Sequence, residues 1–321
     1  MPESRGSHES PGAPGPAPRS YLYAPGSRPD VLRKALRAGA DAVILDLEDA
    51  VVPGEKVTAR RHVADLLAEL ADGLGAELAA ERTAERAGRP PCQVHVRINR
   101  TDTGFDLDDL RAVVGPALTA LRLPKVESAD QVRFLAEVLS ERESRAGLAA
   151  GSVGLYPVVE SARGVFAAGS IAAAPRVIRL GLGVADLLAD VGARGDGGSL
   201  TDHARAHLVL AGRVAGAGAP VDSVFTDLHD TDGLRRQATA ARDLGFSGKS
   251  VLHPRQVPVV NEVFAPGAEE LAEARAVLAA AELAARRGVG ALTVDGRFVD
   301  EAVVARARAL IAMAQEDDHV G

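Results

Sequence analysis

Two acidic residues, Glu160 and Asp186, follow neighbouring predicted β-strands, and no histidine or cysteine lies between them in the sequence. Carboxylate oxygens are hard ligands, which suit Mg²⁺ or Mn²⁺ better than zinc. Arg97 stands near the end of another predicted strand and offers a planar fork of N–H donors that can bind a carboxylate. These residue types predict a site for one divalent cation, bound by Glu160 and Asp186, and for an anionic substrate bound by Arg97.

A second interpretation of the two acids stays open at this point. Acidic and hydroxyl side chains often cap the first turn of a helix by accepting hydrogen bonds from backbone N–H groups. Glu160 precedes Ser161, and Asp186 closes the run that begins at Gly183, so each acid could simply begin the helix after its strand. Only the positions of the strands and helices can separate metal binding from capping.

The strands that carry these residues belong to a regular alternation. Short apolar segments alternate with longer segments in which apolar residues recur every three or four positions, which is typical of a parallel sheet covered by helices. The predicted strands are Tyr21–Pro25, Ala42–Leu47, Gln93–Ile98, Ala120–Pro124, Gly154–Val159, Val177–Leu182, Asp222–Asp227 and Gly248–Leu252. The predicted helices between them include Val31–Ala38, Lys56–Ala71, Asp130–Glu141, Asp202–Ala215 and Leu234–Leu244.

Eight alternating units predict a closed (β/α)₈ TIM barrel in the α/β class, because no glycine-rich nucleotide-binding turn follows the first strand. In such a barrel the loops after the strands build the active site. We expect the acids at the end of the second strand to support the site, for example by hydrogen-bonding Arg97. The further polar and charged residues expected at this rim are Asp46, Glu48, Asp49, Asn99, Lys125, Glu127, Asp227 and His253.

Lys125 offers a different chemistry at the same rim. A lysine inside a barrel can form a Schiff base with a carbonyl substrate, as in metal-free aldolases. Because Lys125 is followed by Val126 and Glu127, it could equally be the inert partner of an acid. Both possibilities remain open on the sequence alone.

Composition limits the other classes of function. The chain has 321 residues, of which 46% are hydrophobic, with a formal net charge of −7 and one cysteine. A negative chain without a basic block is unsuited to nucleic acid, and a lone cysteine excludes an internal disulfide framework. No apolar run approaches the roughly 20 residues of a membrane span, and the start of the chain has no signal pattern. These features predict a soluble, cytoplasmic protein that binds no membrane.

We expect three parts in the chain. Residues 1–18, rich in Pro, Gly and Ser, are predicted to be a disordered tail, and 19–265 to form the catalytic barrel. Residues 266–321 are predicted to be a C-terminal extension or lid, and two polar, alanine-rich inserts at 72–91 and 142–152 are expected at the periphery. Within the extension we predict a helix over 269–287, a turn-rich or hairpin segment over 289–297 and a helix over 300–314.

Several runs of residues occur along the chain in an order typical of one family. They are Arg19–Pro29, Gly39–Ala50, Val94–Asn99, Leu123–Ser128, Pro157–Ala162, Gly181–Leu187 and Gly248–Pro254. Together they resemble the citrate lyase β-subunit-like family, within the HpcH/HpaI aldolase superfamily of CoA-ester lyases. The resemblance covers residues 19–315.

The resemblance implies a metal-dependent barrel enzyme that breaks or forms a carbon–carbon bond. Its substrate would be a (3S)-malyl-, citramalyl- or citryl-CoA-type ester, made from a CoA thioester and a 2-oxo acid such as glyoxylate, pyruvate or oxaloacetate. By the family's motifs, Glu160 and Asp186 match the metal ligands and Arg97 matches the arginine that binds substrate oxygens. Ser27 and Ala185 depart from the family's pattern, and Ala185 removes an acidic side chain beside the metal, which implies a difference in substrate specificity. An acyl-carrier-dependent citrate lyase subunit inside a larger complex is a further possibility.

The resemblance also assigns residues outside the predicted metal site. Asp300 matches an acid/base aspartate that the C-terminal segment supplies to a neighbouring subunit, which implies a homo-oligomer, a trimer or hexamer. On the residues alone, Asp300 could instead cap the last helix, because it precedes Glu301 and an apolar run. The residues that fall where CoA-using members contact the cofactor are Tyr23, Lys34, Ser250 and Val251.

Overall fold

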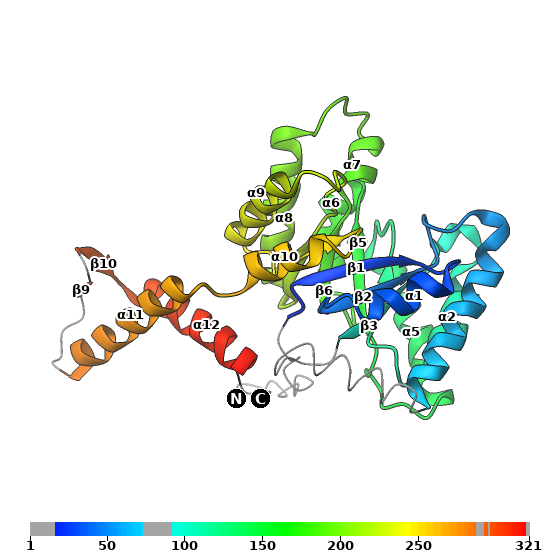
Figure 1. Ribbon diagram of the computed structural model, residues 1–321, viewed down its shortest axis with the longest axis horizontal. Helices are drawn as coiled ribbons and strands as arrows, with labels where there is room; N and C mark the ends of the chain where they lie inside the picture. Colours follow the sequence, from blue (N-terminus) through cyan, green and yellow to red (C-terminus); the bar gives the residue numbers. More distant parts are fainter. Residues whose placement is uncertain (1–16, 73–91, 287–291, 295, 319–321) are drawn as a thin grey trace, which may run out of the picture. The chain divides into compact units, whose positions relative to one another are not determined.

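The computed structural model describes residues 17–72, 92–286, 292–294 and 296–318. The chain divides at Pro266 into a barrel unit and a C-terminal unit (Figure 1). Most of the predicted tail and of the insert at 72–91 lies outside the described residues. None of the helices in the described ranges is both long enough and apolar enough to cross a membrane.

The barrel unit consists of eight parallel strands that close on themselves in chain order, because β1 pairs with both β2 and β8. This closed order confirms the predicted (β/α)₈ fold. The strands are β1 Ser20–Pro25, β2 Ala42–Asp46, β3 Gln93–Arg97, β4 Ala120–Leu123, β5 Gly154–Val159, β6 Arg179–Leu182, β7 Gly218–Asp222 and β8 Gly248–Val251. The α-helices are α1 Pro29–Leu36, α2 Lys56–Ala71, α4 Asp106–Val113, α5 Ala129–Arg145, α6 Ala162–Ala172, α7 Val184–Asp190, α8 Gly198–Ala215, α9 Thr231–Leu244 and α10 Gln256–Phe264.

The prediction for the seventh strand, Asp222–Asp227, is wrong, because β7 is Gly218–Asp222 and ends where the predicted strand begins. The residues after β7 include Val, Phe and Thr, which have a higher β-propensity than the glycine and proline of β7. The earlier segment nevertheless forms the strand because its backbone pairs with both β6 and β8. Asp227 therefore lies in a turn, where its carboxylate accepts hydrogen bonds from the N–H groups of His229 and Asp230.

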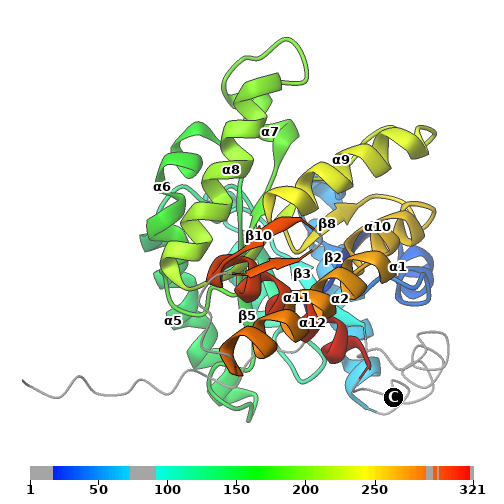
Figure 2. The same ribbon diagram turned by 90° about the vertical axis from the view of Figure 1, so that its left-hand side faces the viewer.

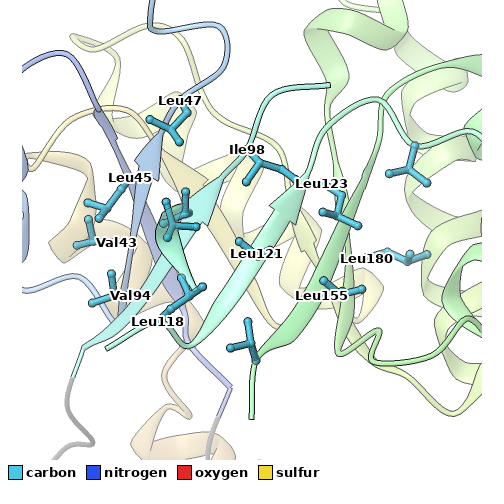
Figure 3. Packing of buried hydrophobic residues seen from close by; sticks show 14 of the residues in the cluster. Val43, Leu45, Leu47, Val94, Ile98, Leu118, Leu121, Leu123, Leu155 and Leu180 are labelled. Carbon is cyan, nitrogen blue, oxygen red and sulfur yellow. The ribbon is translucent and has the colours of Figure 1, made fainter. Parts of the chain in front are cut away.

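Side chains on the two faces of the strands fill two separate cores. Those that face the helices form one continuous apolar cluster, part of which is shown in Figure 3. Leu121 and Leu123 of β4 belong to it, so Arg122 between them points to the opposite face, which is the inside of the barrel. There the buried Arg122 guanidinium lies 4.5 Å and 4.7 Å from the ring centres of Tyr21 and Tyr156.

The C-terminal unit is a pair of helices connected by a hairpin (Figure 2). Helix α11, Ala268–Arg286, packs against α12, Glu301–Asp318, and strand β9, Leu292–Val294, pairs antiparallel with β10, Arg297–Val299. The turn between the strands contains Gly296 at φ 78°, a left-handed conformation that glycine adopts without steric cost. The expected lid function and the packing on a neighbouring subunit stay predictions.

The segment predicted as a peripheral insert at 142–152 is anchored by a buried acid. Helix α5 continues into it, and Glu143 in its last turn is fully buried. The Glu143 carboxylate accepts hydrogen bonds from the N–H groups of Val153 at 2.8 Å and Gly151 at 3.0 Å, and it pairs with Arg176 at 2.7 Å. Burial alone would raise the pKa of Glu143, but Arg176 and these N–H groups lower it. Glu143 therefore ties this segment to the barrel, while most of its residues are exposed, as expected for a peripheral segment.

We expect Glu143→Gln to destabilise the barrel by about 1–3 kcal/mol at neutral pH, because the partly buried Arg176 loses its counter-charge. A lowered pKa means that ionised Glu143 stabilises the fold above the unfolded-chain pKa of about 4.3, and that this contribution disappears as the pH falls through the folded value. The difference in unfolding free energy between wild type and variant, measured by urea denaturation, should therefore shrink as the pH is lowered from neutral. Glu141→Gln, which removes an exposed partner of Arg145, should cost less than about 0.5 kcal/mol at any pH. Equal losses in the two variants would contradict this account.

Candidate active site

Charged residues at or just after the ends of five strands meet at one end of the barrel. Asp46 ends β2 and Arg97 ends β3, while Lys125 and Glu160 follow β4 and β5. Asp186 lies in the first turn of α7, directly after β6. Because the strands are parallel, their carboxyl ends open on the same rim, so these side chains share one mouth.

Arg97 is held in place by acids from β2 and the loop that follows it. Its Nε and Nη2 donate to the two carboxylate oxygens of Asp46 at 2.7 Å and 2.6 Å, and its Nη1 lies 2.9 Å from Glu48 and 3.3 Å from Asp49. The guanidinium also lies 4.9 Å from the ring centre of Tyr23. A bidentate pair of this kind fixes the orientation of the guanidinium. The expected hydrogen bonds from Arg97 are present to Asp46 and Asp49, whereas Glu48 forms an ion pair with the guanidinium.

Glu160 is 5% exposed, and backbone groups set its position. Its Oε1 accepts a hydrogen bond from the Lys125 N–H at 2.7 Å. Its Oε2 lies so close to Gly183 that a Cβ atom added there would be only 2.2 Å away. The helix α6 is capped by Ser161, whose hydroxyl accepts from the Gly164 N–H, so Glu160 is not the cap. Its carboxylate is therefore available for another partner.

Asp186 does not cap a helix either, because α7 begins after Gly183 and Asp186 lies inside its first turn. Its side chain is 39% exposed, and its Oδ1 lies 3.2 Å from the Lys125 ammonium. Asp186 is close enough to Glu160 for its charge to raise the pKa of that carboxyl. The two acids that the sequence analysis paired are thus neighbours at the mouth.

Lys125 reaches across the mouth and has an unusual backbone conformation. Its φ is 50°, in the left-handed region that side chains other than glycine rarely adopt. Its ammonium lies 3.3 Å from Glu48, 3.6 Å from Asp49 and 3.2 Å from Asp186. Burial opposes the charge, but these three carboxylates raise the pKa of Lys125 above its usual value. Lys125 therefore stays a charged ammonium at neutral pH.

Negative charge is in excess at this mouth. The Lys56 ammonium donates to the Leu47 and Glu48 carbonyls. The acidic side chains of the mouth are Asp46, Glu48, Asp49, Glu160 and Asp186, and its cationic side chains are Lys56, Arg97 and Lys125. When all are ionised, two negative charges remain uncompensated, which is the charge that one divalent cation neutralises.

The excess charge also shows in the protonation of the buried acids. Burial, together with the nearby Asp186, raises the pKa of Glu160 to about 8. Burial, together with Asp49, raises the pKa of Glu48 to about 7 although Arg97 acts in the opposite direction. Carboxylates in this state gain from the arrival of a cation, and such shifted groups in a mouth are common at functional sites.

An all-oxygen donor pair fits Mg²⁺ or Mn²⁺. Over the described part of the chain, no group of three or more His, Cys, Asp or Glu side chains is arranged to hold a metal. A cation held by Glu160 and Asp186 would therefore complete its coordination with water or substrate oxygens, which is usual for Mg²⁺.

The residues predicted to contact CoA lie in different surroundings. Tyr23 lies in the mouth beneath Arg97. Ser250 and Val251 on β8 are buried, so only a small part of either could touch a ligand. The Lys34 ammonium is exposed and lies 3.8 Å from Asp30 on the same helix. The mouth brings only Tyr23 of these four together with the acids, and a shared role in CoA binding stays a prediction.

Asp300 belongs to the C-terminal unit. Its Oδ1 accepts a hydrogen bond from the Val303 N–H at 3.0 Å, so it caps the first turn of α12, as the local sequence suggested. This local role does not test the acid/base function, which remains a prediction. His253 also has a local role, because its Nδ1 accepts from the Arg255 N–H.

Two features of the mouth are absent from the sequence prediction. One is Gly183, whose missing side chain gives Glu160 its space. The other is the Lys125 main chain, which orients Glu160 through its N–H group. The glycine at position 183, three residues before Asp186, could have suggested the space for Glu160. No residue near Lys125 in the sequence predicts its left-handed backbone conformation.

Comparison with known proteins places this site in context. The family model described as HpcH/HpaI aldolase/citrate lyase matches residues 19–254. The citrate lyase subunit beta of Leuconostoc mesenteroides subsp. cremoris is 36% identical over 92% of this chain and 93% of its own length. The L-malyl-CoA/beta-methylmalyl-CoA lyase of Cereibacter sphaeroides is 35% identical over 92% of this chain and 94% of its own length.

Among solved structures, the protein CitE from Mycobacterium tuberculosis, in complex with magnesium, acetoacetate and coenzyme A, is 34% identical in sequence and has a TM-score of 0.71. The similarity covers 94% of this chain and 98% of that one. With the family match spanning all eight barrel strands and the relatives spanning nearly the full length, this chain belongs to the HpcH/HpaI aldolase/citrate lyase family.

Proposed function

We propose that this chain is a Mg²⁺-dependent carbon–carbon lyase that cleaves or forms a (3S)-malyl-, citramalyl- or citryl-CoA-type ester, with a CoA thioester and a 2-oxo acid as the partners. The observation that carries the proposal is the pair of Glu160 and Asp186 in a mouth with excess negative charge. A cation bound to them would supply Lewis-acid polarisation of the 2-oxo carbonyl. Mn²⁺ suits the same ligands.

The names of the relatives support the substrate class. CitE from Mycobacterium tuberculosis has been solved with magnesium and oxaloacetate and with magnesium and pyruvate. The Cereibacter sphaeroides relatives include both a malyl-CoA lyase and a (3S)-malyl-CoA thioesterase, each 35% identical to this chain. Relatives at this level of identity thus include both a lyase and a thioesterase. The assay below distinguishes the two reactions by their products, a 2-oxo acid or free CoA thiol.

We assign Arg97 to the substrate oxygens. Asp46 holds two of its nitrogens, so the guanidinium needs no reorganisation when a carboxylate or a developing oxyanion arrives. Its third nitrogen lies 2.9 Å from the buried Glu48 and 3.3 Å from Asp49, whose side chain is 53% exposed, so a ligand would approach this nitrogen from the side of Asp49. Replacement of the Arg97 guanidinium should weaken substrate binding and lower turnover together.

Proton transfer is assigned to Asp300 of a neighbouring copy, in a homo-oligomer such as a trimer or hexamer. The resemblance to the family supports this assignment, and Tyr23, Lys34, Ser250 and Val251 are the corresponding candidates for CoA binding. In cleavage, a base takes the substrate hydroxyl proton as the carbon–carbon bond breaks, and an acid/base group returns a proton to the thioester carbon.

A metal-free Schiff-base mechanism through Lys125 is less well supported. A Schiff-base lysine must lose its proton to attack a carbonyl, and it therefore needs a lowered pKa. Three carboxylates around the Lys125 ammonium raise its pKa instead. Borohydride trapping at Lys125, with activity retained in EDTA, would favour this mechanism over ours.

We expect Glu160→Gln and Asp186→Asn each to weaken Mg²⁺ binding by more than the roughly 10- to 100-fold that loss of a supporting group costs, and to abolish lyase activity. Mg²⁺ affinity is measured by calorimetry on the EDTA-treated chain, and activity on malyl-, citramalyl- and citryl-CoA by release of the 2-oxo acid. Free CoA thiol measured in parallel reports thioester hydrolysis. Glu127→Gln, which changes a rim acid bonded to Ser161, is the matched control and should bind Mg²⁺ normally.

Several outcomes would redirect the proposal. Unchanged Mg²⁺ affinity in both variants would remove the metal site and with it the mechanism. Normal Mg²⁺ binding without activity on any free CoA ester, together with capture of partner subunits, would favour the acyl-carrier-dependent citrate lyase subunit. Release of CoA thiol without a 2-oxo acid would identify a thioesterase.

Gly183→Ala should displace Glu160, because the new Cβ would lie 2.2 Å from its Oε2. We expect Mg²⁺ affinity to fall by roughly 10- to 100-fold, the usual effect of disturbing the support of a metal ligand. Gly195→Ala is the matched control, since nothing lies within 4 Å of a Cβ there. Equal Mg²⁺ affinities of the two variants in calorimetry would show that Glu160 needs no space at Gly183.

Asp300→Asn should abolish lyase activity without loss of stability, because asparagine caps a helix as well as aspartate does. A mixture of inactive Asp300→Asn and inactive Glu160→Gln chains, allowed to exchange subunits, should recover up to about a quarter of wild-type activity if each site draws on two copies. Activity that stays at the level of the separate variants would mean that Asp300 does not act across subunits.

A further inference from the structure

The Lys125 ammonium binds one of the two acids that we assign to the cation. Its Nζ lies 3.2 Å from the Asp186 Oδ1 and 3.3 Å from the Glu48 Oε1. A positive charge this close to a carboxylate oxygen repels a metal ion that binds the same carboxylate. The same lysine also contacts the second assigned ligand, Glu160, but through its main chain.

We propose that Lys125 sets the metal affinity of this mouth by competing with the cation for the Asp186 carboxylate. The inference rests on the proposed function, because it takes Glu160 and Asp186 as the metal ligands. Lys125 would be a positioning residue rather than a catalytic one: its ammonium weakens cation binding, while its N–H group keeps Glu160 oriented toward the mouth.

The surroundings of Lys125 support competition rather than a passive surface ion pair. Its side chain is only 25% exposed, so water screens its charge less than that of a fully exposed lysine. Glu48, Asp49 and Asp186 all lie within 4 Å of the ammonium, so it cannot leave Asp186 without staying near the other acids. A divalent cation at Asp186 would therefore always face a nearby positive charge, which lowers its affinity.

The backbone allows the two effects of Lys125 to be separated by substitution. The Glu160 hydrogen bond comes from the Lys125 N–H, which every residue except proline retains. The φ of 50° is adopted most readily by glycine, so glycine at this position preserves the main-chain geometry and removes the ammonium. Methionine removes the charge and keeps most of the side-chain volume.

The test is Mg²⁺ calorimetry on the full chain after EDTA treatment, which needs no activity assay. We expect Lys125→Met and Lys125→Gly both to bind Mg²⁺ about tenfold more tightly than wild type, and Lys125→Arg, which keeps the charge, to stay close to wild type. Arg145→Met, which makes the same change in net charge at an exposed pair with Glu141, should leave the affinity unchanged. Lys125→Gly decides the question if Lys125→Met fails to fold.

The outcomes separate this inference from the proposed function. If wild type binds Mg²⁺ and loses it in Glu160→Gln, but Lys125→Met and Lys125→Gly bind no more tightly, the competition is refuted and the metal site stands. If wild type itself does not bind Mg²⁺, both ideas fail together. Equal tightening in Arg145→Met would reduce the effect to net charge and would also overturn the role of Lys125.

Discussion

Repulsion among buried carboxylates is the constraint on which the mouth of this barrel depends. Asp46, Glu48 and Glu160 are each less than 10% exposed, and they lie near one another because parallel strands end at a common rim. Burying charges of one sign is costly unless cations or protons accompany them. Arg97 and Lys125 offset part of this charge, but burial and the nearby Asp186 still raise the pKa of Glu160.

Backbone groups decide where the acids sit. The Asp46 carboxylate accepts from the N–H groups of Glu48 and Ala50 as well as from Arg97. Glu160 depends on the Lys125 N–H and on the missing side chain of Gly183. These main-chain groups lie just after the ends of β2, β4 and β6. The geometry of the mouth is thus a property of the strand ends more than of the side chains.

The residues assigned to the proposed chemistry lie in two structural units. The barrel carries the acids, Arg97 and Lys125, whereas Asp300 lies in the helical unit that begins at Pro266. Each of these residues also has a structural role within its own unit. Asp300 caps α12, and Lys125 neutralises part of the negative charge of the mouth. A residue with a clear structural role can still act on a substrate, so the capping role of Asp300 and the assigned proton transfer are compatible.

Much of this protein followed from sequence alone, because alternation of apolar segments and the identity of strand-end residues are local properties. They predicted the closed barrel and the acids and arginine at its rim. Strand β7 was misplaced because pairing with β6 and β8 overrode the stronger β-propensity of the next segment. Three features were decided only by the tertiary structure. They are that Glu160 caps no helix, that Lys125 has a left-handed backbone conformation, and which carboxylates surround the Lys125 ammonium. The carboxylates around the Lys125 ammonium come from residues far apart in the chain, and no local pattern records their distances or their electric field.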